Sequence, residues 1–102
     1  MSCLQINKLR GDELDHLFEA ILSLKTKEEC YKFFDDVATM NEIKSFALRF
    51  HVATLLHEGK KYQEIEELTK ASTATISRVR RCLDFGSGGY GIILDRMMEE
   101  KK

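Results

Sequence analysis

The feature that most constrains the fold of this chain is helical periodicity that no proline interrupts. None of the 102 residues is proline, and apolar side chains recur at the three- and four-residue spacing of a helix face. The first such run predicts a helix over residues 12–24 and is formed by Leu14, Leu17, Phe18, Ile21 and Leu22. The sequence therefore predicts an all-α fold.

Two capping signatures indicate where the next helices begin. Each pairs a threonine with a glutamate three residues later, as in a capping box: Thr26 with Glu29, and Thr39 with Glu42. The helix after the second signature is expected to end near Gly59, because glycine suits the end of a helix. Two short helices are then expected at about 62–69 and 72–83.

Glycine interrupts the helical pattern near the end of the chain. Four of the six glycines fall within residues 86–91, so a loop is expected there. A last amphipathic helix is expected at about 91–100. Its apolar side chains are expected to return to the core: Ile92, Ile93, Leu94, Met97 and Met98.

Charge is distributed unevenly along the chain. Its 16 basic and 17 acidic side chains nearly cancel, but residues 60–83 carry six basic against three acidic side chains.

No apolar run approaches the roughly 18 residues of a membrane-spanning helix. The N-terminus also lacks the basic-then-apolar layout of a signal peptide. We therefore expect a cytoplasmic protein with no membrane partner. The cysteines and histidines lack metal-ligand spacing, so no metal site is expected.

The segment from Tyr62 to Val79 has the pattern of a helix-turn-helix. This unit needs a short helix, a tight turn and a second helix held across the first by small or apolar side chains. The expected seam consists of Ile65, Thr69, Ala71, Ile76 and Val79. Ser72 is placed to cap the second helix. Two positions depart from the pattern: Lys70 stands where the turn usually has glycine, and Glu66 where a small residue is usual.

The outward face of the second helix is suited to duplex DNA. In this motif the N-terminal part of that helix enters the major groove, where arginine can bind guanine or clamp phosphate. Small hydroxyl residues permit a close approach, and flanking lysines would bind the backbone. The candidate DNA-binding residues are Lys60, Lys61, Lys70, Ser72, Thr73, Ala74, Thr75, Ser77, Arg78 and Arg81.

Two other functional classes stand beside a sequence-specific DNA-binding regulator. The net charge of -1 and the acidic first half favour a protein-interaction module without DNA recognition, because nucleic-acid domains are often far more basic. An enzyme is not expected. Adjacent carboxylates such as Asp35 and Asp36 face different ways on a helix, and no nucleophile motif accompanies Ser72 or Cys82.

Several stretches of this chain resemble the Trp repressor superfamily. They are Leu55-Leu56-His57-Glu58-Gly59, the segment from Tyr62 to Leu68, and Ala74-Thr75-Ile76-Ser77-Arg78. The tail from Arg81 to Tyr90 is similar to the YerC/YecD branch of that superfamily. The resemblance implies a Trp-repressor-like homodimer with interlocked N-terminal helices, and a transcriptional repressor that binds double-stranded DNA.

The length of 102 residues suits one domain, because domains most often run about 100–150 residues, and the chain is interpreted as a single domain over residues 1–102. Its expected parts are dimerisation and core helices at 1–59, the helix-turn-helix at 60–83, a glycine-rich loop at 84–91 and a C-terminal helix at 92–102.

The resemblance also implies an L-tryptophan corepressor held between two arginines. Arg78 matches the arginine of the recognition helix and is the candidate effector contact. Leu48 stands at the position of the other arginine, and Val79 replaces a glycine beside the flat indole. We therefore expect no tight L-tryptophan binding, and the sequence identifies no other effector or cofactor.

Overall fold

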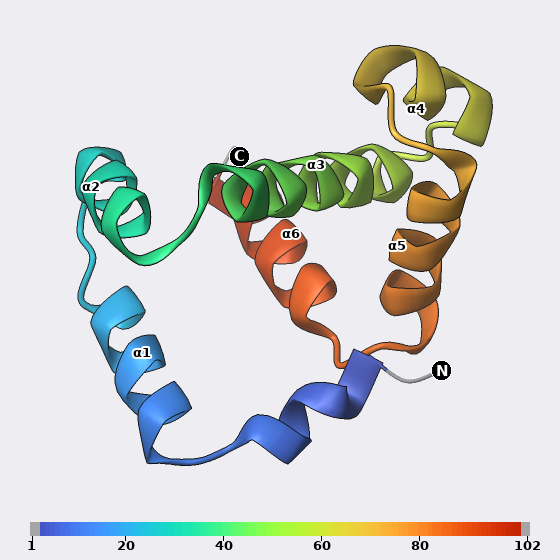
Figure 1. The fold of residues 1–102 in the computed structure, drawn as a ribbon. Coiled ribbons are helices and arrows are strands. Elements are labelled where there is room, and N and C mark those ends of the chain that lie inside the picture. Colours follow the sequence, from blue (N-terminus) through green and yellow to red (C-terminus); the bar gives the residue numbers. More distant parts are fainter. Residues whose placement is uncertain (1–2, 101–102) are drawn as a thin grey trace. The chain divides into compact units, whose positions relative to one another are not determined.

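The computed structural model describes residues 3–100, with side chains from residue 6 onward, so the predicted segments at 1–2 and 101–102 lie outside the described residues. Every regular element in the described range is a helix (Figure 1). A 3-10 helix, η1 (Cys3–Leu9), precedes α1 (Asp12–Leu22), α2 (Lys27–Val37), α3 (Met40–His57), α4 (Tyr62–Thr69), α5 (Thr73–Phe85) and α6 (Gly89–Glu100). The prediction of an all-α fold is confirmed, and η1 is an element that the periodicity did not indicate.

The chain forms two compact units. The first is Leu4–Lys44, which holds α1, α2 and the first turn of α3. The second takes in the described residues from Ser45 onward, with the rest of α3 and all of α4, α5 and α6. Within the described residues, no helix combines the length and the apolar character that crossing a bilayer requires.

Hydrogen bonds between nearby residues fix the helix ends of the first unit. The hydroxyl of Thr39 accepts from the backbone N–H of Glu42 at 3.1 Å, and the Glu42 carboxylate accepts from the backbone N–H of Thr39 at 2.8 Å. These bonds hold the pKa of Glu42 below its usual value, the backbone bond most strongly. The capping box predicted for α3 is therefore confirmed. At α2, Thr26 caps Glu29, whose carboxylate accepts instead from the N–H of Lys25.

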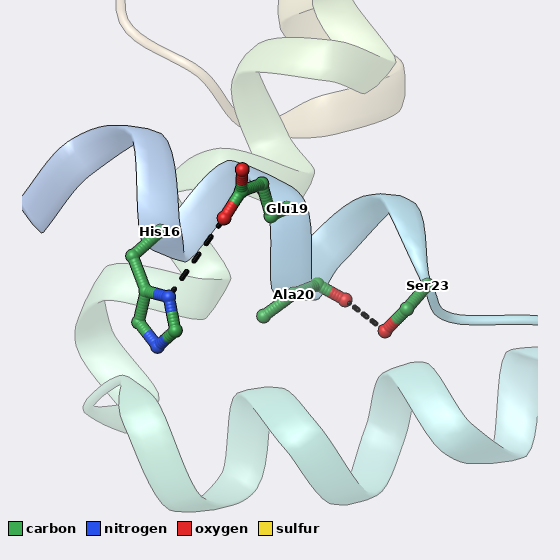
Figure 2. A network of polar contacts seen from close by, with 4 residues as sticks. All are labelled: His16, Glu19, Ala20 and Ser23. Atoms are coloured by element: carbon green, nitrogen blue, oxygen red, sulfur yellow. Dashed lines mark hydrogen bonds and ion pairs between the residues drawn. The ribbon is translucent and has the colours of Figure 1, made fainter. Parts of the chain in front are cut away.

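Two local polar contacts lie along the surface of α1 and at its end. The Nδ1 atom of His16 lies 3.8 Å from Oε1 of Glu19, and the hydroxyl of Ser23 donates to the carbonyl oxygen of Ala20 at 2.7 Å (Figure 2). The second bond satisfies a carbonyl at the end of the helix. Neither α1 nor α2 buries a side chain completely, although both are amphipathic. Their apolar faces are thus left largely uncovered.

The core of the second unit gathers side chains from all four of its helices. The buried residues are Val52, Ala53, Leu55, Leu56, Ile65, Ala71, Ile76, Val79 and Leu94. Four of the five expected seam residues are in this core. The fifth, Thr69, is half-buried; its hydroxyl donates to the carbonyl oxygen of Ile65 and accepts from the N–H of Ala71. It thereby satisfies backbone groups where α4 ends.

The glycine-rich loop is shorter than the predicted segment 84–91. Helix α5 continues to Phe85 and α6 already begins at Gly89, so Gly86–Gly88 alone separate them. Gly88 has a φ of 88°, a left-handed conformation that reverses the chain at low cost for glycine. The loop is shorter because the reversal at Gly88 is enough to join the two helices. Gly89 and Gly91 are then not needed for the turn and can be helical.

Helix α6 meets the core differently from the sequence-based expectation. Leu94 is buried, and Tyr90, one turn earlier, packs against the core with its ring 6.4 Å from that of Phe50. The other apolar side chains expected in the core are exposed by about half: Ile92, Ile93, Met97 and Met98. A helix that packs along one side buries a single stripe, so these side chains cannot all turn inward. His57 of α3 also lies 3.4 Å from Asp95 of α6, measured from Nε2 to Oδ1.

Candidate nucleic-acid interface

Two exposed lysines lie between α3 and α4. Helix α3 ends at His57, and Gly59 follows with a φ of 87° that lets the N–H of Lys60 donate back to the carbonyl oxygen of Leu55 at 3.0 Å. Lys61 follows with its backbone N–H donating to the Glu64 carboxylate at 3.2 Å. The backbone of both lysines is therefore fixed, while both side chains remain exposed.

The turn between α4 and α5 consists of residues 70–72 (Figure 1). Lys70 adopts the left-handed conformation, with φ 62° and ψ 13°, and its N–H donates to the carbonyl oxygen of Glu66. It is the one described residue other than glycine with a positive φ. The next residue, Ala71, is buried. Lys70 therefore adopts the conformation for which this turn usually has glycine, and it keeps an exposed ammonium group there.

Ser72 is the N-cap of α5, as predicted. Its hydroxyl oxygen accepts from the backbone N–H of Thr75 at 3.1 Å, and its O–H donates to the Thr75 hydroxyl at 3.1 Å. The Ser72 hydroxyl thus bonds both the backbone and the side chain of Thr75 at the helix start. Both residues are candidate DNA contacts, and in this structure the Ser72 hydroxyl caps the backbone of α5 while also bonding the Thr75 side chain.

The first residue of α5 is bonded to α4. The Thr73 hydroxyl donates to the Glu66 carboxylate, with 3.2 Å between Oγ1 and Oε2. Both side chains are exposed. The sequence marks Glu66 only as an unusual residue and does not predict this contact. The contact can be identified only from the tertiary structure, because the two residues lie on different helices.

One face of α5 carries most of the other candidates. At about 100° per residue, Thr73, Ser77 and Arg81 follow one another along the helix, with Ala74 and Arg78 beside them. The opposite side is buried through Ile76 and Val79. Ala74, Arg78 and Arg81 are exposed, whereas Ser77 is half-buried. Thr75 points away from this face, which agrees with its bond to the cap.

The arginines of α5 differ in their partners. Arg80 holds Asp84 through two contacts, from Nε to Oδ2 at 3.2 Å and from Nη2 to Oδ1 at 3.1 Å. Arg78 and Arg81 make no ion pair with any side chain among residues 6–100. Their guanidinium groups are therefore available to a ligand, and Arg80 is already neutralised within its own helix.

The two positions that depart from the corepressor pattern lie at the core, whereas the candidate effector contact Arg78 is exposed. Leu48 packs against the core and Val79 is 1% exposed. The neighbouring Arg49 bonds the Ser45 hydroxyl at 2.8 Å, and its guanidinium carbon lies 5.7 Å from the centre of the Phe46 ring. Burial raises the pKa of Tyr90, against the smaller opposite effect of the Arg49 charge. No cluster of three or more metal-ligating side chains is found among the described residues.

Comparison with known proteins relates this arrangement to one family. The family model described as Trp repressor protein matches residues 12–98, which is most of the chain. The chain belongs to the Trp repressor family. YerC of Bacillus subtilis (strain 168), described as uncharacterized, is 60% identical over 96 residues; the match covers 94% of this chain and 92% of YerC.

Two solved structures share the fold. A Staphylococcus aureus protein described as a candidate Trp repressor is 55% identical with a TM-score of 0.88, over 92% of this chain and 94% of that protein. A TrpR-like protein from Eubacterium eligens ATCC 27750 is 52% identical with a TM-score of 0.86, over 89% and 94%. The predicted superfamily is thus confirmed, and α4, the turn and α5 all lie inside the family match.

Proposed function

We propose that this protein is a sequence-specific DNA-binding transcriptional regulator that represses by occlusion and reads the major groove with α4 and α5 as a helix-turn-helix. Membership of the Trp repressor family supports a DNA-binding regulator. The observation that carries the proposal is the division of α5 into two sides. Ile76 and Val79 anchor one side in the core. The other side exposes the capped helix start together with Arg78 and Arg81, which make no ion pair with side chains among residues 6–100.

Each part of the interface has a distinct proposed role. Arg78 and Arg81 bond guanine or phosphate, and Ala74 permits close approach to the base edges. Lys60, Lys61 and Lys70 contact the phosphate backbone on either side of α4, where their ammonium groups are exposed. The remaining candidates act at the helix start and along its face: Ser72 and Thr75 by shaping the cap, and Thr73 and Ser77 by facing the groove.

The proposed regulator is a homodimer formed through the helices of the first unit. The apolar side chains of α1 and α2 are exposed in one chain, with Leu22 84% and Tyr31 75% accessible. Interlocking with a second chain would cover them in a shared core. A dimer also presents two copies of α5 to half-sites about 34–36 Å apart, one turn of the double helix.

The second candidate function is a protein-interaction module on the same fold. The exposed glutamates of α4 favour it, because Glu64, Glu66 and Glu67 place negative charge beside the proposed DNA-binding face. Heparin chromatography separates the two functions. Retention beyond moderate salt supports nucleic-acid binding, and passage without retention supports a protein partner.

The direct test is selection of genomic DNA fragments by the purified protein at physiological salt. The regulator is expected to enrich a two-fold-symmetric site whose half-sites are one helical turn apart. About 6–10 phosphate contacts per dimer would give binding that weakens about 10³- to 10⁵-fold between 50 and 200 mM salt. Failure to enrich any sequence, together with passage through heparin, would contradict the proposal.

A further inference from the structure

The bond between Thr73 and Glu66 constrains what the start of α5 can recognise. Thr73 is the first residue of α5, and Glu66 lies seven positions earlier on α4. Both side chains are exposed next to the face that carries Ala74, Arg78 and Arg81. The bond therefore lies at the surface that the proposed function assigns to DNA.

Hydrogen-bond chemistry limits what this pair can offer to a ligand. A threonine hydroxyl has one proton and two lone pairs, and a carboxylate has lone pairs only. Because Thr73 donates its proton to Glu66, its oxygen has only acceptor capacity left. The Glu66 carboxylate likewise only accepts. Together the two side chains present hydrogen-bond acceptors and no donor.

The major groove contains few groups that suit such a pair. Phosphate oxygens, guanine O6 and N7, and thymine O4 are all acceptors, so they cannot bond it, and phosphate is also repelled by the carboxylate charge. The donors on the base edges are the amino groups of cytosine N4 and adenine N6. Among the base edges of the major groove, the pair can therefore bond the amino groups of cytosine and adenine.

We propose that Thr73 and Glu66 together determine specificity by accepting a hydrogen bond from the amino group of cytosine or adenine at one position in each half-site. This inference rests on the proposed DNA-binding function and adds a base preference to it. It gives the pair a role opposite to that of Arg78 and Arg81, which are donors. It also gives a role to one of the three glutamates in the basic segment 60–83.

A purely structural role for Glu66 makes a different prediction. A carboxylate near the start of α5 also stabilises that helix through its dipole. Removal of such a contact changes thermal stability and leaves base preference as it is. The readout of the test must therefore be the preference at single positions, with stability measured in parallel.

The test uses two variants and a matched control in selection from a pool with randomised half-sites. Glu66→Gln keeps the size of the side chain but adds donors, and Thr73→Val removes the hydroxyl at nearly constant volume. Glu67→Gln makes the same charge change on the neighbouring exposed residue of α4, for which the structure gives no bond to Thr73. All proteins are compared at one salt concentration.

We expect the wild type to prefer cytosine or adenine over guanine and thymine at one position by about five- to a hundredfold. Both Glu66→Gln and Thr73→Val are expected to weaken that preference, with the glutamine variant accepting guanine or thymine there. Preferences at the other positions, and all preferences of Glu67→Gln, are expected to match the wild type.

Two outcomes would overturn the inference alone. The first is a symmetric site selected with unchanged base preferences by Glu66→Gln, whether or not its stability changes. The second is a wild-type site that shows no preference for cytosine or adenine at any position sensitive to these variants. A wild type that enriches no sequence would instead refute the proposed function, and the inference with it.

Discussion

The three arginines of α5 provide an internal comparison at the scale of single residues. Arg80 is paired with Asp84, whereas Arg78 and Arg81 are exposed and make no ion pair with the described side chains. Loss of a guanidinium matters for DNA affinity only where that group reaches the DNA. Arg80 therefore serves as the control for its two neighbours.

We predict that Arg78→Ala and Arg81→Ala each weaken binding to the selected fragment by about five- to a hundredfold if the arginine reads guanine. An arginine that contacts phosphate instead lowers the salt slope by about 1. Arg80→Ala is expected to bind like the wild type. Fluorescence anisotropy across a salt series measures both quantities. Unchanged affinity and slope in the first two variants would show that the reading face is misassigned.

Lys70 adopts an unfavourable backbone conformation and is also proposed to contact phosphate. A left-handed conformation costs an L-residue roughly 1–2 kcal/mol, and glycine avoids this cost but adds roughly 0.5–1 kcal/mol of chain entropy. Lys70→Gly is therefore expected to be more stable by up to about 1 kcal/mol, by urea unfolding, while binding DNA more weakly. Lys61→Gly removes the same charge from an extended residue and should give no gain in stability. A less stable Lys70→Gly would contradict this account.

At the scale of whole elements, the end of α5 is sensitive to a single methyl group. A Cβ added at Gly86 would collide with the carbonyl oxygen of Cys82, whereas one added at Gly91 would meet no atom within 4 Å. We predict that Gly86→Ala destabilises the fold by about 1–3 kcal/mol. Gly91→Ala should stabilise it by about 0.5–1 kcal/mol, because alanine favours the helix. Thermal unfolding of the two variants tests this, and equal melting temperatures would contradict it.

Much of the helical order could be predicted from sequence because its signals are local. The Thr39 cap, the Gly59 helix end and the Ser72 cap each depend on residues a few positions apart. The start of α6 could not be predicted in this way, since Gly89 and Gly91 resemble loop residues until the reversal at Gly88 is known.

The candidate site could be predicted from the sequence to about the same extent as the helices. Apolar spacing identified Ile76 and Val79 as the buried side of α5, and so identified the exposed side as well. The bond between Thr73 and Glu66 was not predictable, because it depends on how α4 and α5 cross. Nor did the sequence indicate that α6 would bury Leu94 while Ile92 stays exposed, since packing decides which stripe faces inward.

At the scale of the whole molecule, the basic segment 60–83 is attached to a chain whose net charge is -1. The proposed attraction to DNA then depends on local charge, and the acidic remainder would disfavour approach by other surfaces. The family relationship raises the separate question of an effector. Val79 is buried and Leu48 packs against the core. These are the two positions that depart from the corepressor pattern, and neither side chain leaves an obvious place for an indole.

We therefore predict no tight binding of L-tryptophan and no effect of L-tryptophan on DNA affinity. Isothermal titration calorimetry with the full chain measures the first, and anisotropy with and without the amino acid measures the second. Low-micromolar affinity in the calorimeter would overturn this prediction.

The claim on which the account depends is that the start of α5 enters the major groove, and methylation interference tests it most directly. Dimethyl sulfate methylates guanine N7 in the major groove and adenine N3 in the minor groove of the selected site. We predict that methyl groups on guanine N7 within both half-sites block binding, while those on adenine N3 there do not. Binding that tolerates every N7 methyl group in the half-sites would contradict the account.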